Sequence, residues 1–194
     1  MSRTASVSRT TDETDITVQL NLDGSGSAAS DTGIPFFDHM LQQLGRHAGW
    51  DLDVTCKGDL EVDGHHTVED CGIAIGTALA EALGDKAGIR RFASITVPLD
   101  EAAVEVALDL SGRPFVVHEV EVPYETIDGF DTGLLEDFVR AFAQTAGLTI
   151  HVHLRYGRSP HHICEAEFKA MAKALGDACG LSGRSGVPST KGTL

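Results

Sequence analysis

The feature that most limits how this chain can fold is an internal repeat. The block His-His-x-x-Glu occurs at positions 65–69 and again at 161–165, so each half of the 194-residue chain contains one copy. Three further similarities recur in the same order: Asp-Glu before alternating apolar residues (12–22 and 100–110), Ala-Gly before a strand-like pattern (48–54 and 146–152), and Ala-Leu-Gly-Asp (82–85 and 174–177). Several landmarks that recur in one order indicate a duplication. We therefore expect two related halves, 1–88 and 89–180, followed by a basic C-terminal tail, 181–194.

Hydrophobic periodicity predicts the elements within each half. Apolar residues that alternate with polar ones predict half-buried strands, and longer periods predict amphipathic helices. The expected strands are 16–22, 52–56, 104–110 and 148–154, with 115–122 as the hairpin partner of 104–110. The expected helices are 37–48, 67–83, 134–146 and 162–179. Residues 1–11 lack an apolar period, so we expect a mobile or loosely docked lead-in.

Composition excludes several kinds of partner. The formal net charge of −14 argues against nucleic acid and against an anionic membrane surface. No apolar run approaches the roughly 18 residues that cross a bilayer, and the N-terminus lacks the apolar centre of a signal peptide. The four cysteines have no close spacing, which is typical of reduced thiols in the cytosol. A cytoplasmic protein with a small-molecule substrate is the resulting prediction.

The repeated histidines and carboxylates predict a site for two metal ions. A glutamate three or four positions after a histidine lies on the same face of a helix. Adjacent histidines diverge by about 100° and cannot comfortably bind one ion, so each pair indicates two metals. The repeat places Asp137 opposite His39. The candidate ligands are His39, His65, His66, Glu69, Asp137, His161, His162 and Glu165.

These donors suit divalent manganese, iron, cobalt or zinc, because no thiolate favours a softer ion. A single His-His pair at a helix start is more often a solvated cap, but two pairs in matching repeats favour metal binding. Four other histidines have no repeated partner and are expected to be structural: His47, His118, His151 and His153.

Four motifs together resemble one known family. They are Asp38-His39-Met40-Leu41, the run 63–70 around the first His-His pair, the run 161–169 around the second, and Pro188-Ser189-Thr190-Lys191-Gly192. In this order and spacing they resemble the imidazoleglycerol-phosphate dehydratases of histidine biosynthesis, along nearly the whole chain from Arg9 onward. The resemblance implies an α+β fold made of two duplicated α/β half-domains, each a four-stranded sheet packed with two helices.

The resemblance also implies an activity and an assembly. Such an enzyme dehydrates imidazole glycerol phosphate to imidazole acetol phosphate and water, with two Mn²⁺ ions per active site. It implies a homo-oligomer of 24 subunits built from trimers, with active sites between subunits. Chemical reasoning suggests that the substrate ring binds as imidazolate between the two ions, which act as Lewis acids.

Residue roles follow from the same motifs. The resemblance assigns all the candidate ligands except Asp137 to metal binding; the family usually has histidine at position 137. Glu13 matches a substrate-contacting glutamate and is a candidate proton-transfer group, and Gln43 lies in the substrate-lining segment. The substrate phosphate is expected to be held by Arg91, Arg113, Lys169, Ser189 and Lys191.

Two other classes of protein remain as alternatives. A two-metal hydrolase would use similar ligands, but such sites favour carboxylates that bridge the two ions. We expect a monofunctional dehydratase without a phosphatase domain. A metal-storage protein would not need the cationic set of Arg91, Arg113 and Lys191.

Overall fold

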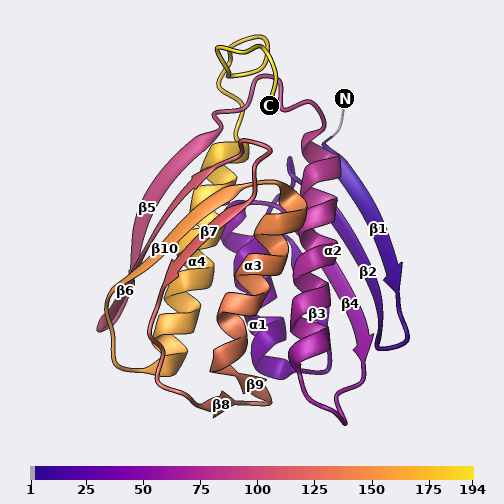
Figure 1. Ribbon diagram of the computed structural model, residues 1–194, viewed down its shortest axis with the longest axis vertical. Helices are drawn as coiled ribbons and strands as arrows, with labels where there is room; N and C mark the ends of the chain where they lie inside the picture. Colours follow the sequence, from indigo (N-terminus) through magenta and orange to yellow (C-terminus); the bar gives the residue numbers. More distant parts are fainter. Residues whose placement is uncertain (1–2) are drawn as a thin grey trace.

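Two four-stranded sheets form the outer layers of the molecule, and four helices lie between them (Figure 1). The computed structural model describes residues 3–194. The first sheet has the order β1-β2-β4-β3, with β1 (Thr4–Thr10), β2 (Thr14–Asn21), β4 (Asp51–Gly58) and β3 (Ala28–Asp31). The second has the order β5-β6-β10-β7, with β5 (Phe92–Leu99), β6 (Ala102–Asp109), β10 (Thr149–Tyr156) and β7 (Phe115–Glu119).

The four helices join the two halves. They are α1 (Pro35–Ala48), α2 (His65–Leu83), α3 (Leu135–Ala146) and α4 (Pro160–Cys179). α1 packs against α4 and α2 against α3, so each pair contains one helix from each half. Along β2 every second side chain is buried, and these side chains join those of the helices and the other sheet in one apolar core. Removing this surface from water is the main force that holds the halves together.

Both halves run through the same order of elements: three strands, a helix, a strand and a helix. In the second half, a small hairpin, β8 (Thr126–Ile127) and β9 (Phe130–Asp131), and a 3₁₀ turn, η1 (Thr132–Leu134), precede the first helix. In each sheet an antiparallel hairpin is followed by a strand that runs parallel to the last strand. The predicted pair of α/β halves, each a four-stranded sheet with two helices, is confirmed. The predicted boundary after residue 88 falls in the connection between α2 and β5.

Within each pair the two helices run parallel, so the first turns of the helices lie at one end of the molecule. Gly72 and Gly76 allow α2 and α3 to approach closely. A Cβ atom at Gly72 would lie 2.9 Å from the Phe138 carbonyl oxygen, and one at Gly76 would lie 2.2 Å from Thr145 Oγ1. Both His-His pairs belong to the first turns of their helices, because α2 begins at His65 and α4 at Pro160, two residues earlier than predicted in each case.

Two predictions about strands are wrong. Residues 4–10 do not form a loosely docked lead-in: they are β1, paired with β2 from Thr4–Asn21 to Thr10–Asp15. Its apolar alternation is weak because the inward face carries only Ala5 and Val7 before Arg9. Met1 and Ser2 lie outside the described residues. Residues 115–122 are not the hairpin partner of 104–110. β5 is the hairpin partner of β6, and β7 pairs in parallel with β10 instead.

Candidate active site

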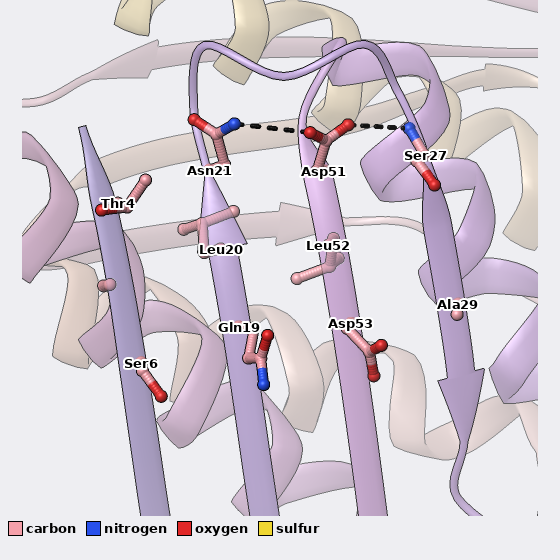
Figure 2. Close-up of a pocket in the computed structure, with 11 residues that line it drawn as sticks. Thr4, Ser6, Gln19, Leu20, Asn21, Ser27, Ala29, Asp51, Leu52 and Asp53 are labelled. Atoms are coloured by element: carbon pink, nitrogen blue, oxygen red, sulfur yellow. Dashed lines mark hydrogen bonds between the residues drawn. The ribbon is translucent and has the colours of Figure 1, made fainter. Parts of the chain in front are cut away.

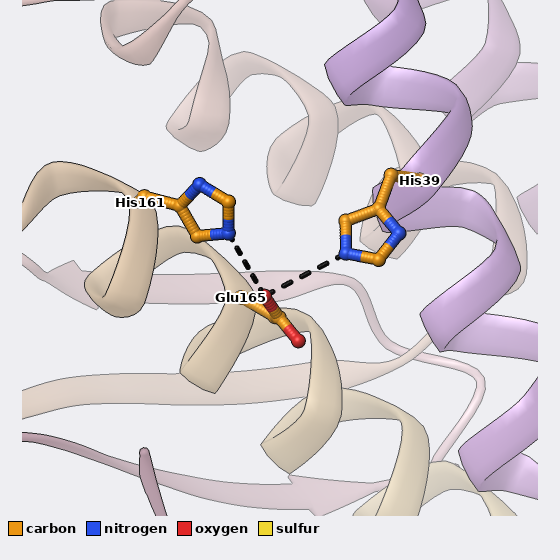
Figure 3. Close-up of side chains that lie close together, drawn as sticks. All are labelled: His39, His161 and Glu165. Atoms are coloured by element: carbon orange, nitrogen blue, oxygen red, sulfur yellow. Dashed lines mark hydrogen bonds and ion pairs between the residues drawn. The ribbon is translucent and has the colours of Figure 1, made fainter. Parts of the chain in front are cut away.

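The first two turns of α1 and α4 bring His39, His161 and Glu165 together (Figure 3). Glu165 Oε2 lies 3.6 Å from His39 Nε2 and 3.1 Å from His161 Nε2. The three ligand atoms lie within 4.8 Å of one another. Within residues 3–194, this is the one group of three or more such side chains that is close enough to hold a metal ion. We call it the α1–α4 cluster.

The surroundings of Glu165 keep its carboxylate ionised, which suits the binding of a cation. Its side chain is only 13% exposed, and its other carboxylate oxygen lies 2.6 Å from Lys169 Nζ. Burial raises the pKa of Glu165, but the hydrogen bond and charge of Lys169, with smaller contributions from His161 and His39, bring the pKa below its usual value. The carboxylate is therefore ionised near neutral pH and offers a negative charge to the cluster.

The matching positions of the other half form the α2–α3 cluster: His65, Glu69 and Asp137. His65 Nε2 lies 3.7 Å from Glu69 Oε2, and His65 Nδ1 lies 3.5 Å from Asp137 Oδ2. The two carboxylates thus approach opposite nitrogens of one ring, and the three side chains do not converge on a common point. Asp137 lies beside His65 of the other half, a neighbour that its match to His39 in the repeat did not indicate, and the arrangement is more open than that of the α1–α4 cluster.

His66 and His162 point away from these clusters. The two rings of each His-His pair are nearly perpendicular, with centroids 6.1 Å apart in the first pair and 5.9 Å in the second. His66 Nδ1 lies 3.1 Å from Asp59 Oδ2, and His162 Nδ1 lies 2.6 Å from Glu101 Oε2. A carboxylate on one ring nitrogen orients the imidazole and leaves the other nitrogen available as a ligand.

These carboxylates also change proton affinities. The hydrogen bond that His66 donates to Asp59 raises the pKa of His66, and the one that His162 donates to Glu101 raises the pKa of His162. In return, the hydrogen bond from His162 lowers the pKa of Glu101 to about 2, with further hydrogen bonds from backbone N–H groups. Glu101 therefore remains ionised at any pH near neutrality.

Glu13 lies beside one of these histidines, whereas Gln43 contacts a different histidine. Glu13 is in the turn between β1 and β2, and its Oε1 lies 3.5 Å from His66 Nε2. Gln43 is on α1 one turn after His39, and its Oε1 lies 2.9 Å from His47 Nε2. Glu13 is thus next to a candidate ligand, whereas the contact of Gln43 is with His47, which is not one.

The predicted phosphate-binding residues divide between the two ends of the molecule. Arg91 forms two hydrogen bonds with Asp109, of 2.7 and 3.1 Å, and a third to the Pro188 carbonyl oxygen. Arg113 lies 3.9 Å from Asp109, and the tail with Ser189 and Lys191 follows Pro188. Lys169 alone lies near a ligand cluster.

The distance between the two ends follows from α4. Arg91 N–H donates to the carbonyl oxygen of Ala178 at the end of α4, whereas His161 is in the first turn. At a rise of 1.5 Å per residue, this stretch of helix is roughly 25 Å long. The tail and both arginines are therefore far from the α1–α4 cluster of the same chain (Figure 1).

The sequence pattern of the family "Imidazoleglycerol-phosphate dehydratase" matches residues 32–175. This chain belongs to the imidazoleglycerol-phosphate dehydratase family. It is therefore a dehydratase, a carbon–oxygen lyase of histidine biosynthesis that acts on imidazoleglycerol phosphate.

Individual relatives agree with this membership. An imidazoleglycerol-phosphate dehydratase of Frankia casuarinae is 55% identical over 100% of both chains, and that of Jannaschia sp. is 54% identical over 99% of this chain and 100% of its own. The solved structure of the Pyrococcus furiosus protein matches with a TM-score of 0.84 and 37% identity, covering 97% of this chain and 100% of the other. That of Staphylococcus aureus gives 0.83 and 35%, covering 92% and 99%. The described helices of this dehydratase include none with the length and apolar character of a membrane span.

Sequence reasoning missed three carboxylates of this dehydratase. Asp59 and Glu101 orient His66 and His162, and Asp70 binds the hairpin that carries Glu13. The repeat contained a signal for Glu101, since it stands opposite Glu13. No comparable signal indicated Asp59, and Asp70 resembles an ordinary helix carboxylate until its contacts are known.

Proposed function

We propose that this chain converts imidazole glycerol phosphate to imidazole acetol phosphate and water with two Mn²⁺ ions per active site. The observation that carries the metal proposal is the α1–α4 cluster, in which two imidazole nitrogens and an ionised carboxylate converge. Neutral imidazole and carboxylate donors fit Mn²⁺ well. The four cysteines are buried as free thiols, so no thiolate biases the choice toward a softer metal.

We assign the candidate ligands to two ions. His39, His161 and Glu165 would hold one ion, and His65 and Glu69, with Asp137, would hold the other. Bound divalent ions would supply Lewis-acid polarisation of the imidazole ring and a template for its orientation. His66 and His162, each oriented through Nδ1, have a partly exposed Nε2 side available for a further bond.

We also propose that active sites form between subunits of a homo-oligomer, with 24 chains built from trimers. Two observations support this assembly. The eight candidate ligands fall into separate groups within one chain, so His66 and His162 need a partner chain to complete a shell. Arg91, Arg113 and the tail lie at the opposite end from the α1–α4 cluster, so a substrate at a cluster would meet the cationic set of another subunit.

The remaining residues act on the substrate. Glu13 would move the carbon-bound proton, and Gln43 would line the site. The cationic set would hold the remote phosphate, whose binding energy positions the reacting carbon. Arg91 is already held by Asp109 and the Pro188 carbonyl oxygen, so little side-chain freedom would be lost when phosphate binds.

The test is turnover of imidazole glycerol phosphate by metal-stripped protein before and after addition of Mn²⁺, with elemental analysis of the same sample. We expect activity to return as two ions bind per chain. One ion per chain with weak activity would indicate that the α2–α3 cluster does not hold metal in this protein. Full metal loading without turnover would contradict the proposal and leave a metal-binding protein or a hydrolase.

A further inference from the structure

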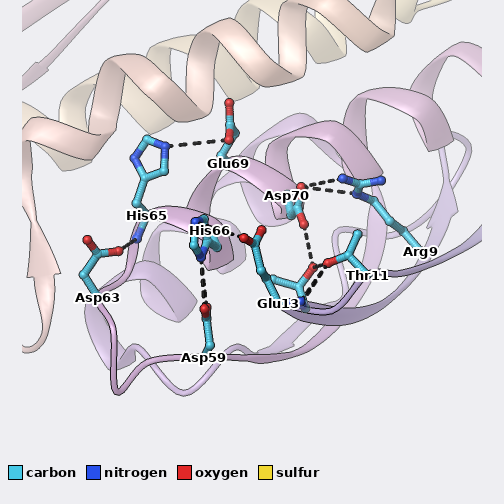
Figure 4. A network of polar contacts seen from close by, with 10 residues as sticks. Arg9, Thr11, Glu13, Asp59, Asp63, His65, His66, Glu69 and Asp70 are labelled. Atoms are coloured by element: carbon cyan, nitrogen blue, oxygen red, sulfur yellow. Dashed lines mark hydrogen bonds and ion pairs between the residues drawn. The ribbon is translucent and has the colours of Figure 1, made fainter.

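Asp70 connects α2 to the hairpin that carries Glu13 (Figure 4). It follows Glu69 and lies one turn after His66, and its side chain is 8% exposed. Its Oδ1 accepts two hydrogen bonds from the Arg9 guanidinium, at 3.2 and 2.8 Å. Its Oδ2 accepts one from Thr14 Oγ1 at 2.5 Å. One buried carboxylate on α2 therefore binds both strands that flank the turn.

These contacts continue to the backbone of Glu13. Thr11 Oγ1 lies 3.3 Å from Thr14 Oγ1 and accepts the N–H groups of Glu13 at 3.1 Å and of Thr14 at 3.0 Å. The turn is closed by a hydrogen bond from Thr11 N–H to the Thr14 carbonyl oxygen. These hydrogen bonds fix the hairpin on α2 through its backbone and through Arg9 and Thr14. The Glu13 side chain is not among them: it is 52% exposed and faces His66 Nε2.

In the second half, a different carboxylate attaches the hairpin turn to the neighbouring loop and helix. Glu101, which matches Glu13 in the repeat, uses its own carboxylate. Its Oε1 accepts N–H groups of Arg158 at 3.2 Å and Ser159 at 2.7 Å, and its Oε2 binds His162. Ala166 stands at the position that matches Asp70. In the second half, which lacks this aspartate, the glutamate of the hairpin turn itself accepts the hydrogen bonds that fix the neighbouring loop.

We propose that Asp70 is a positioning residue for the dehydration: by holding the hairpin through Arg9 and Thr14, it leaves the Glu13 carboxylate available to the substrate at a set distance from His66. Asp70 does not touch the reacting atoms. This inference rests on the proton-transfer role proposed for Glu13, because a fixed hairpin affects turnover only if Glu13 takes part in it.

The test is a double-mutant cycle on the Mn²⁺-loaded protein with Asp70→Asn and Glu13→Gln. Asparagine keeps the shape of the side chain but removes the charge that pairs with Arg9. We expect Asp70→Asn to lower kcat by about 100-fold, the cost of misplacing a reacting group by about 1 Å, with KM nearly unchanged. In the Glu13→Gln background, the same change should have little further effect, since residues that act as a unit are not additive.

Two further readouts separate positioning from damage to the fold or to the metal site. Metal content by elemental analysis should be the same in Asp70→Asn and in the unaltered protein. Hydrogen exchange at the Glu13 and Thr14 amides should become faster, because both are held by Thr11. The matched control is Asp23→Asn, which removes the Arg3–Asp23 pair near the other end of β1; it should leave kcat unchanged.

The outcomes are distinct. An unchanged kcat in Asp70→Asn overturns the inference, as does an equal loss in both backgrounds, which would indicate a structural role independent of Glu13. Loss of metal from Asp70→Asn would also overturn it. If Glu13→Gln alone keeps normal turnover, the proposed role of Glu13 fails first and the inference fails with it.

Discussion

The two ligand clusters descend from one repeated pattern but differ in how closely their side chains gather. In the α1–α4 cluster, both histidines approach the same oxygen of a carboxylate that is 13% exposed. In the α2–α3 cluster, the matching carboxylate of Glu69 is 46% exposed, and Asp137 approaches the other side of the His65 ring. Similar helix packing therefore does not guarantee a similar site.

Two substitutions within the repeat account for the difference. Asp137 stands where the first half has His39, and its shorter side chain does not reach the Nε2 side of His65. Ile73 stands where the second half has Lys169, so Glu69 lacks the ammonium group that holds Glu165. The duplication preserved the backbone arrangement, while individual side chains set how complete each cluster is within one chain.

The turn glutamates show the same divergence. Glu101 is engaged by His162 and two backbone N–H groups, whereas the Glu13 side chain is half-exposed on a hairpin that Asp70 holds. One copy orients a ligand, and we assign the other to the substrate. Substitution of each glutamate distinguishes the two tasks.

The largest effect is expected for Glu13→Gln. Removing a proton-transfer group costs 10²–10⁴-fold in rate, so kcat should fall by about 100-fold or more. Metal content should not change, because glutamine keeps the shape of the side chain and Asp59 continues to orient His66. Steady-state kinetics with elemental analysis checks this. Normal turnover in the loaded variant would contradict the role.

Glu101→Ala should show the opposite behaviour. Loss of the carboxylate that orients a ligand histidine lowers metal affinity by about 10–100-fold. Activity should therefore fall at low Mn²⁺ and recover at saturating Mn²⁺, which a metal titration of kcat would reveal. Glu101→Gln is the matched control, since its amide oxygen can still accept from His162. A kcat that remains low at saturation would place Glu101 with Glu13 in the chemistry.

A smaller effect is expected for Asp137→His, which makes the α2–α3 cluster resemble its counterpart. The longer imidazole can reach past Nδ1 of His65 toward the Nε2 side, so the second ion should bind more tightly, on the order of tenfold. Competition with a chelator of known affinity measures this. Weaker binding would show that aspartate is the better ligand here, and no change would exclude position 137 from the metal shell.

Much of this architecture could be predicted from the sequence. The repeat indicated the two halves, and the resemblance implied two sheets with two helices each; the structure shows both. The sequence matched Asp137 to His39 but did not indicate that Asp137 lies beside His65 of the other half. It could not show that β7 pairs with β10, because strand order depends on contacts between distant segments. Nor could it show that Arg91 lies far from His161, since spacing along the chain says nothing about which end of a helix a loop reaches.

The smallest effect is expected for Asp23→Asn. Asp23 pairs with Arg3 near one end of β1, and Asp70 pairs with Arg9 near the other end. The hydrogen bond from Arg3 lowers the pKa of Asp23 below its ordinary value. The pair therefore stabilises the fold above the ordinary aspartate pKa, and this contribution disappears as the pH falls through the lowered value. Because the Asp23 side chain is 49% exposed, Asp23→Asn should reduce the free energy of unfolding at pH 7 by only about 0.2–1 kcal/mol. Chemical denaturation at pH 7 and pH 3 measures this, and the difference between the two proteins should shrink at the lower pH. A larger loss at pH 3 than at pH 7 would have the wrong sign for an ion pair and would mean that Asp23 acts through packing of the β2–β3 turn instead.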